Sequence, residues 1–222
     1  MIKVMLYVSI GTVAMLLPMV IVAANRKTKL WKSLPVAFYA TVTGTLSTYL
    51  WFFLENQWIG GISFFGAVFL VPMAFLLMRK PLREPYDNMM DMFAAGICMM
   101  LAVMKVQCLT SGCCGGRVLY YDANAVAVVF PSQLAELANA VVLMLVLLIM
   151  GIKNRNRGRL YPWFMILYGV TRFVLNIFRQ EWVTYDGPLM PLGNIWSLLA
   201  LAAGIVWLVV LHRRAKTATE NP

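Results

Sequence analysis

Seven runs of about 20 mostly apolar residues follow one another along this chain, separated by short polar loops. They cover approximately residues 4–24, 34–54, 62–78, 88–107, 132–152, 160–178 and 192–211. A run of this length crosses the hydrocarbon core of a bilayer as an α-helix. Only 13% of the residues are charged, against about a quarter in soluble domains. We therefore predict an all-α integral membrane protein of about seven transmembrane helices, forming a single domain over residues 1–222.

The positions of the basic residues predict how the helices are oriented. Four lie in residues 26–32, three in 79–83, four in 153–159 and three in 213–216, which is 14 of the 19 Lys and Arg residues. Alternating spans place these regions on one side of the membrane, and such basic loops are cytoplasmic. We therefore predict an external amino terminus and a cytoplasmic carboxyl terminus. The same loops account for the net charge of +10 without nucleic-acid binding.

The predicted outer half of the protein contains the five remaining basic residues: Lys3, Lys105, Arg117, Arg172 and Arg179. An ionisable group within a membrane helix costs a few kcal/mol and is usually retained for a partner or a function. Guanidinium binds phosphate with two parallel hydrogen bonds, so the phosphate of an outer-leaflet phospholipid is an expected partner of Arg172 and Arg179. The alternative is an ion pair of Arg172 with Glu136 or Glu181.

Three of the four cysteines lie within residues 105–117, at the start of a predicted outer-face loop of about residues 108–130. The fourth, Cys98, lies in the middle of an apolar run, where a free cysteine packs as a small hydrophobe. For Cys108, Cys113 and Cys114 we consider three interpretations. In the first, a disulfide pins the loop, as oxidising compartments allow.

In the second interpretation, Lys105 and Arg117 lower the pKa of a loop thiol, and the thiolate acts as a nucleophile or acceptor. In the third, the thiols bind a metal ion. Four-coordinate zinc would need a further ligand, and the only histidine, His212, is predicted at the cytoplasmic end. We therefore predict no metal and no cofactor.

Five short motifs occur in a fixed order along the chain. They are Gly-Ile-Ser-Phe-Phe-Gly at 61–66, Phe-Pro-Ser-Gln-Leu-Ala-Glu at 130–136, Leu-Tyr-Gly-Val-Thr-Arg-Phe at 167–173, Phe-Arg-Gln-Glu at 178–181 and Gly-Asn-Ile-Trp-Ser at 193–197. This series resembles the prolipoprotein diacylglyceryl transferase family over roughly residues 55–200. The cysteine stretch aligns with the family's signature Arg-Xaa-Gly-Asn-Phe-Xaa-Asn-Gly-Glu-Xaa-Xaa-Gly.

The resemblance implies a function at the outer face of the bacterial inner membrane. The family moves a diacylglyceryl group from phosphatidylglycerol to the thiol of a lipobox cysteine, and it has seven helices with an external amino terminus. The implied partners are a phospholipid and a lipoprotein precursor or another thiol acceptor. The residues implied or expected to hold the lipid headgroup are Lys105, Arg117, Gln133, Tyr168, Arg172 and Arg179.

Several polar residues of the family pattern are replaced in this chain. Phenylalanine stands in place of histidine at Phe65 and Phe130, and the signature stretch carries Lys105, Cys108, Ser111 and Cys113 in place of arginine, two asparagines and glutamate. Asn176 replaces a carboxylate and Asn194 a glutamine. The acid–base groups are therefore largely replaced, whereas the phosphate-side cations remain.

We predict a divergent transferase of this type, with the reacting groups drawn from the cysteines, Glu136 and Arg172. Cys113 is the first choice, because it aligns with the signature glutamate, and Cys114 and Cys108 are the others. Glu136 is the best remaining general base. The alternatives are a non-catalytic protein that binds lipid or a partner on the same fold, and a thiol redox protein of the cell envelope.

Overall fold

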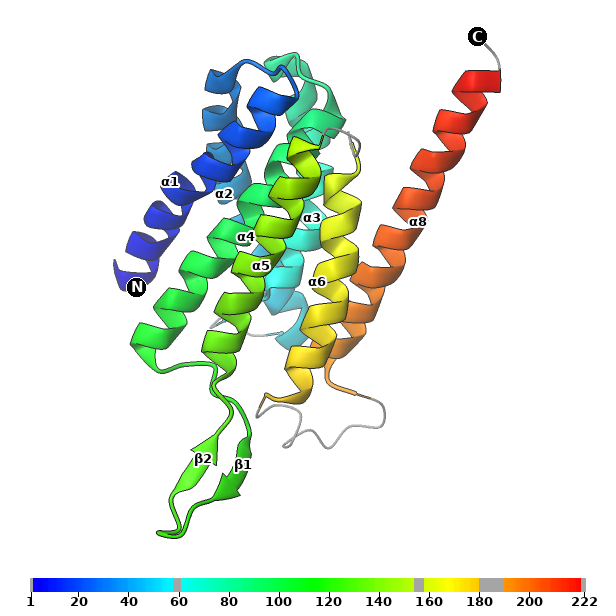
Figure 1. Ribbon diagram of the computed structural model, residues 1–222. Helices are drawn as coiled ribbons and strands as arrows, with labels where there is room; N and C mark the ends of the chain where they lie inside the picture. Colours follow the sequence, from blue (N-terminus) through cyan, green and yellow to red (C-terminus); the bar gives the residue numbers. More distant parts are fainter. Residues whose placement is uncertain (1, 58–60, 154–157, 180–189, 221–222) are drawn as a thin grey trace.

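The computed structural model describes residues 2–57, 61–153, 158–179 and 190–220. Within these residues the chain forms seven long α-helices and one small hairpin of two strands (Figure 1). The helices are α1 (Ile2–Asn25), α2 (Ser33–Asn56), α3 (Phe64–Leu82), α4 (Tyr86–Ser111), α5 (Ser132–Ile152), α6 (Leu160–Ile177) and α8 (Leu192–Glu220). The strands are β1 (Val118–Tyr121) and β2 (Ala127–Val129), and a short 3₁₀ turn, η1 (Leu30–Lys32), precedes α2.

Six of the described helices are long and apolar enough to cross a membrane, which confirms the prediction of an all-α membrane protein. The seventh, α2, is 24 residues long but rich in threonine and serine, which lower its hydropathy. Several of these hydroxyls donate to carbonyls of the same helix; the hydroxyl of Thr43, for example, donates to the carbonyl of Tyr39 at 2.7 Å. Such bonding satisfies a polar side chain inside a membrane helix.

The predicted spans agree with the helices to within about four residues at most ends, and α8 is the exception. We predicted that the last span would end near residue 211, but α8 continues to Glu220. Hydropathy marks the membrane-spanning part of a helix and not its end, since polar residues continue a helix into water. The predicted loop of residues 180–191 lies mostly outside the described residues.

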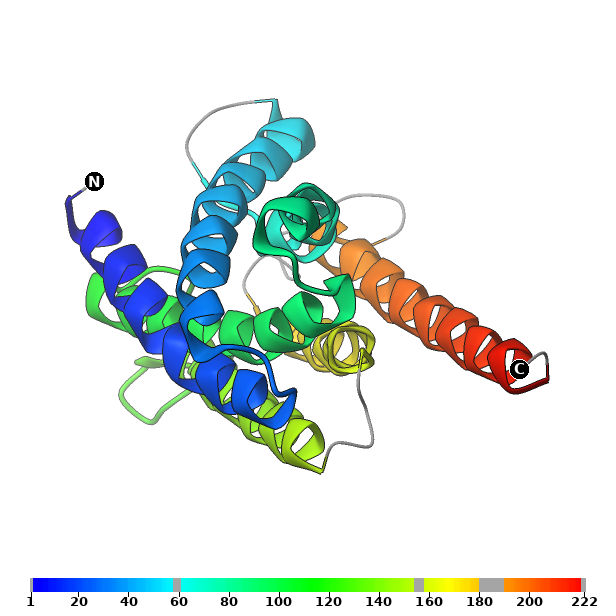
Figure 2. The same cartoon turned by 90° about the horizontal axis from the view of Figure 1, so that it is seen from above.

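Helix α4 is the centre of the bundle, and every residue from Asn88 to Cys98 is buried. Helices α1 and α5 pack against α4, α2 pairs with α3, and α6 pairs with α8. Seen from above, α8 extends away from the other helices toward the carboxyl terminus (Figure 2). Gly96 allows α1 to approach α4 closely, because a Cβ there would lie 2.9 Å from the Met19 side chain. Small residues commonly permit such close packing of membrane helices.

The hairpin lies where we predicted only a polar loop. Strands β1 and β2 pair antiparallel and project beyond the helix ends, opposite the end that carries the carboxyl terminus (Figure 1). The turn is held by the Asp122 carboxylate, which accepts from the backbone N–H groups of Asn124 and Val126 at 2.9 and 2.8 Å. Such short strands without an Asn-Gly or Asp-Gly turn give little sequence signal.

At the other end of the bundle, a buried ion pair joins three segments. Arg26 Nη2 lies 2.8 Å from Asp91 Oδ2, and both side chains are fully buried. Asp91 also accepts from the N–H groups of Gly158 and Leu160 at 2.7 and 3.0 Å. Asp91 in α4 thus holds the end of α1 and the start of α6. The sequence analysis counted Arg26 among the cations of a cytoplasmic loop, but its side chain is buried in the core.

Candidate functional site

The first turns of α5 place the Glu136 side chain inside the bundle, where three basic residues surround it. Its carboxylate forms ion pairs with Lys105 of α4, with Arg172 Nη1 at 2.6 Å and with Arg179 Nη1 at 3.6 Å. The Glu136 side chain is 4% exposed and none of the three cations exceeds 15%. These four residues were singled out separately from the sequence, and the fold brings them together as one group, the Glu136 cluster.

The Glu136 cluster concentrates positive charge in a place that water reaches poorly. One carboxylate and three cations carry a formal charge of +2. Electrostatic attraction is stronger in such surroundings than in bulk water. Of the two partners predicted for Arg172, the structure pairs it with Glu136, and Glu181 lies outside the described residues. This arrangement is suited to attracting an anion while Glu136 holds the cations together.

The loop after α4 is fixed against the start of α5. Gly112 ends α4 in the left-handed conformation, with a φ of 65°. Ser132 Oγ then donates to the Cys114 carbonyl and Gln133 Nε2 to the Cys113 carbonyl, both at 2.6 Å. Cys114 itself has a φ of 60°, which is unusual for a residue other than glycine. The Ser-Gln pair of the 130–136 motif therefore positions the cysteine loop.

The same loop is joined to the end of α6. Gly116 forms a backbone bridge with Arg179, and the N–H of Arg117 donates to the Phe178 carbonyl at 2.9 Å. A side chain at Gly116 would collide with the backbone carbonyl of Phe130. These backbone contacts bring the loop and Arg179 side by side, although more than 60 residues separate them in sequence.

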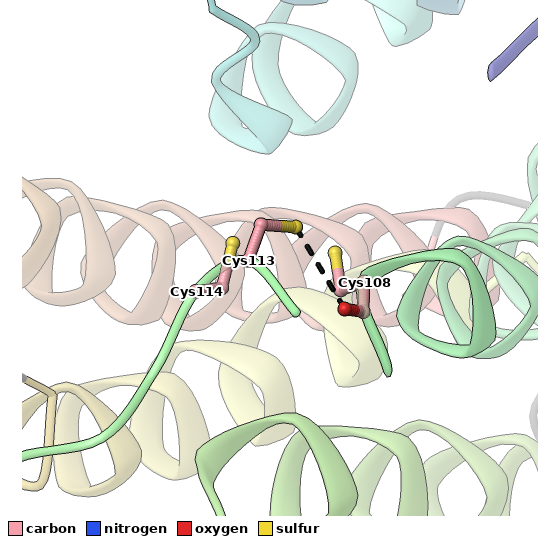
Figure 3. A group of neighbouring side chains, drawn as sticks. All are labelled: Cys108, Cys113 and Cys114. Atoms are coloured by element: carbon pink, nitrogen blue, oxygen red, sulfur yellow. Dashed lines mark hydrogen bonds between the residues drawn. The ribbon is translucent and has the colours of Figure 1, made fainter. Parts of the chain in front are cut away.

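Three thiols gather on this loop. The Sγ atoms of Cys108, Cys113 and Cys114 all lie within 4.8 Å of one another, and all three cysteines are free. Their sulfur atoms lie on one side of the turn, and the Cys113 thiol points to the Cys108 carbonyl at 3.9 Å (Figure 3). Cys113 is exposed, whereas the other two are half-buried. Cys98 is buried in the core, as predicted.

The surroundings of Cys114 favour its thiolate form. A hydrogen bond from the Cys108 thiol, together with the nearby charges of Lys105 and Arg179, lowers the pKa of Cys114 to about 5, although burial opposes this. The sequence also predicts that Arg117 lowers the pKa of a loop thiol. The structure instead places the Arg117 guanidinium over the Phe178 ring, 5.1 Å from its centroid.

The Glu136 cluster and the thiols adjoin a cavity of about 350 Å³. Helices α1, α2, α3 and α4 form its walls, which are apolar at residues such as Val8, Ala40 and Ile97. Its polar end is lined by a group of cations and thiols: Lys105, Arg172, Arg179, Cys108, Cys113 and Cys114. A space that is apolar along its length and cationic at one end matches the amphipathic shape of an anionic phospholipid.

The remaining predicted residues have other surroundings. Tyr168 is buried in an aromatic group, with its ring 5.4 Å from Phe64 and 5.9 Å from Phe65. Phe130 stacks on Phe178 at 4.8 Å. The two phenylalanines that stand in place of histidines thus pack against other rings. The sequence analysis did not predict that Ser132 holds the cysteine loop. Its position beside Gln133 in the 130–136 motif was the one signal that could have indicated this role.

The bundle and its cavity define a multi-pass membrane protein with an internal amphipathic site. Residues 1–210 match the family described as prolipoprotein diacylglyceryl transferase. This chain therefore belongs to the prolipoprotein diacylglyceryl transferase family. Family membership and the apolar helices confirm the predicted resemblance and the predicted multi-pass location in a bacterial inner membrane.

Several relatives carry the name phosphatidylglycerol--prolipoprotein diacylglyceryl transferase. Those of Francisella tularensis subsp. mediasiatica and subsp. novicida are 29% identical to this chain over 175 residues, covering 74% of the chain and 65% of the relative. That of subsp. tularensis strain FSC 198 is 30% identical over 164 residues, covering 69% of the chain and 61% of the relative. The chain thus spans less than two thirds of the length of these relatives.

Proposed function

We propose that this protein is a phospholipid-dependent transferase that moves a diacylglyceryl group from an anionic phospholipid to a thiol. The relatives' names suggest phosphatidylglycerol as the donor and a lipoprotein precursor as the acceptor. The observation that carries the proposal is the apolar cavity that ends at Lys105, Arg172 and Arg179. The acyl chains would lie along the helices, and the headgroup phosphate would meet the cations.

The proposed reaction is a substitution at the glycerol carbon that carries the phosphate. The acceptor thiolate forms a new carbon–sulfur bond, the bond from that carbon to the phosphate oxygen breaks, and glycerol phosphate leaves with both bonding electrons. Three cations at the phosphate stabilise the negative charge that develops on the leaving group. We assign Arg172 and Arg179 to the phosphate because guanidinium can bind it bidentately.

Glu136 and a loop thiol are the remaining candidates for the acid–base step. Glu136 lies among three cations, which supports a positioning role for its carboxylate, although it stays a candidate base. We chose Cys113 first from the sequence. Cys113 is exposed, however, whereas Cys114 is half-buried beside Lys105 and Arg179. These surroundings support Cys114, and not Cys113, as the thiol that takes part in the acid–base step.

We also propose that the cysteine loop faces the outer side of the membrane. The distribution of basic residues supports this orientation. The ends of α1, α3, α5 and α8 that carry the basic residues are on the side of the molecule opposite the hairpin (Figure 1). Labelling the loop cysteines of intact cells with a membrane-impermeant thiol reagent tests the orientation, and labelling only after lysis would contradict it.

The test of function is transfer by the purified full chain in vesicles. A fluorescent peptide with a lipobox cysteine is added to vesicles that contain phosphatidylglycerol or only phosphatidylcholine. We expect the peptide to gain the mass of a diacylglyceryl group with phosphatidylglycerol alone. Replacing Cys98, which is buried in the core, by serine is the matched control and should leave transfer intact.

A second candidate is a protein that binds the lipid without transferring it. The packing of Phe65 and Phe130 favours this candidate, because aromatic rings occupy positions where the family pattern has histidines. Retained phosphatidylglycerol binding without any peptide modification would support it and contradict the transferase. A reversible disulfide between loop thiols, with neither binding nor transfer, would favour an envelope redox protein.

A further inference from the structure

One wall of the cavity is rich in sulfur. Met100 and Met104 precede Cys108 by two turns and one turn on α4, and all three line the cavity. Residues four apart share one face of a helix, so this face presents two thioethers followed by a thiol. The thiols of Cys113 and Cys114 then lie next to that of Cys108. Methionine is a common filler of apolar cores, but here the row leads to three clustered thiols.

We infer that the three loop thiols form a binding site for one thiophilic monovalent metal ion, Cu(I). Thiolate and thioether sulfur are soft ligands, which Cu(I) prefers. Among the described residues, the group holds three His, Cys, Asp or Glu ligands, whereas structural zinc almost always takes four. His212, the chain's only histidine, belongs to α8 and not to this group. The number and softness of the donors therefore favour Cu(I) over Zn(II).

The fold prepares the ligands before any ion arrives. The left-handed turn at Gly112 returns the chain toward Cys108, and Ser132 and Gln133 hold the carbonyls of Cys114 and Cys113. The three sulfur atoms consequently lie on one side of the turn (Figure 3). Ligands held by supporting hydrogen bonds lose less conformational freedom when the ion binds. The sequence predicted no metal because it offers no fourth ligand for zinc, and the backbone turn is what brings the three thiols together.

The basic residues near the thiols would balance the negative charge of the metal-bound site. Three thiolates and one Cu(I) carry a formal charge of −2, and Lys105 and Arg179 line the same cavity. Each thiol releases its proton to solvent when its sulfur binds the metal, and no electron is transferred. The site does not depend on the proposed transferase, so binding can be measured whether or not lipid transfer is found.

The experiment is an anaerobic titration of the reduced, detergent-solubilised full chain with Cu(I) supplied on a coloured Cu(I) chelator. We expect the chain to remove about one equivalent of Cu(I) from the chelator and to develop a near-ultraviolet thiolate-to-metal absorption band. Combining Cys108→Ser, Cys113→Ser and Cys114→Ser should abolish both signals. Cys98→Ser should keep both, because Cys98 is buried in the core and its thiol bonds to the Ala94 carbonyl.

Several results would overturn the site. The first is a reduced chain that leaves all Cu(I) on the chelator, and the second is a triple serine variant that still removes one equivalent. A loop disulfide that persists in excess reductant also contradicts it, because the thiols are then not available. Displacement of Cu(I) by an equal concentration of Zn(II) would contradict the choice of a monovalent ion. A Met104→Leu variant, in contrast, should bind Cu(I) with unchanged affinity, because the proposed ligands are the three thiols alone.

Discussion

Two buried carboxylates, Asp91 and Glu136, lie in different parts of the bundle and have different surroundings. Asp91 meets one cation, Arg26, and two backbone N–H groups. Glu136 meets three cations, Lys105, Arg172 and Arg179, and these cations line the cavity. The first carboxylate joins helices, whereas the second gathers cations where a ligand can reach them. A buried ion pair therefore suggests a binding site when several cations share it and a cavity opens beside it.

The largest expected effect is the loss of the Asp91 charge. Asp91→Asn leaves Arg26 buried without its carboxylate, and breaking a buried pair costs about 3–5 kcal/mol. We expect a marked fall in the thermal unfolding temperature in detergent. Asp87→Asn, at an exposed position one turn earlier on α4, is the control and should lose far less stability than Asp91→Asn. Equal stability of the two variants would contradict the structural role of Asp91.

A smaller loss of stability is expected for Glu136→Gln, about 1–3 kcal/mol, which is the cost of leaving buried donors without their acceptor. The three cations lose their shared carboxylate, but each keeps some exposure to solvent. Added phosphatidylglycerol should recover much of this stability, because its phosphate supplies the missing negative charge. Thermal unfolding with and without the lipid measures this recovery. The same lipid should not rescue Asp91→Asn, and equal rescue of both variants would remove the distinction between the two carboxylates.

Arg172→Gln should affect ligand binding more than folding. Glu136 keeps Lys105 and Arg179, so the unfolding temperature should change little. Loss of a charged hydrogen bond to the headgroup phosphate costs about 1.5–3 kcal/mol, or roughly 10- to 150-fold in affinity for phosphatidylglycerol. The affinity is measured with a fluorescent lipid. Arg79→Gln, at an exposed position near the end of α3, is the control. Equal affinity of the two variants would contradict the role of Arg172.

The smallest effect concerns Glu84, which lies between α3 and α4. Burial opposes its ionisation, but hydrogen bonds from Lys32, Asn88 and Thr28 outweigh this and lower the pKa of Glu84. A lowered pKa in the folded state gives stability that is present above the ordinary carboxyl pKa of about 4.3 and is lost as the pH falls through the folded value. The stability difference between the unaltered protein and Glu84→Gln should therefore shrink below that pH. A constant difference would show that ionisation of Glu84 contributes nothing.

The helices of this protein were predictable because each span must satisfy a local requirement. A run of about 20 apolar residues places its own backbone hydrogen bonds inside a helix, whatever its neighbours are. Arg172 and Glu136 were also recognisable as candidates, since buried charge is costly wherever it occurs in a membrane helix. The hairpin gave little such signal, because pairing of β1 with β2 depends on a turn built around the Asp122 carboxylate.

Sequence alone determined the order of the seven helices and most of their bounds, the family, and the residues whose charge required an explanation. Only the tertiary structure decided which of those residues meet. Arg26 joined the core, Arg117 stacked on Phe178, and Arg179 came to lie beside both Glu136 and Cys114. The physical reason is that hydropathy and charge act along the chain, whereas a site depends on distances between residues far apart in sequence. Those distances follow from helix packing and from the backbone contacts that hold the cysteine loop against α5 and α6.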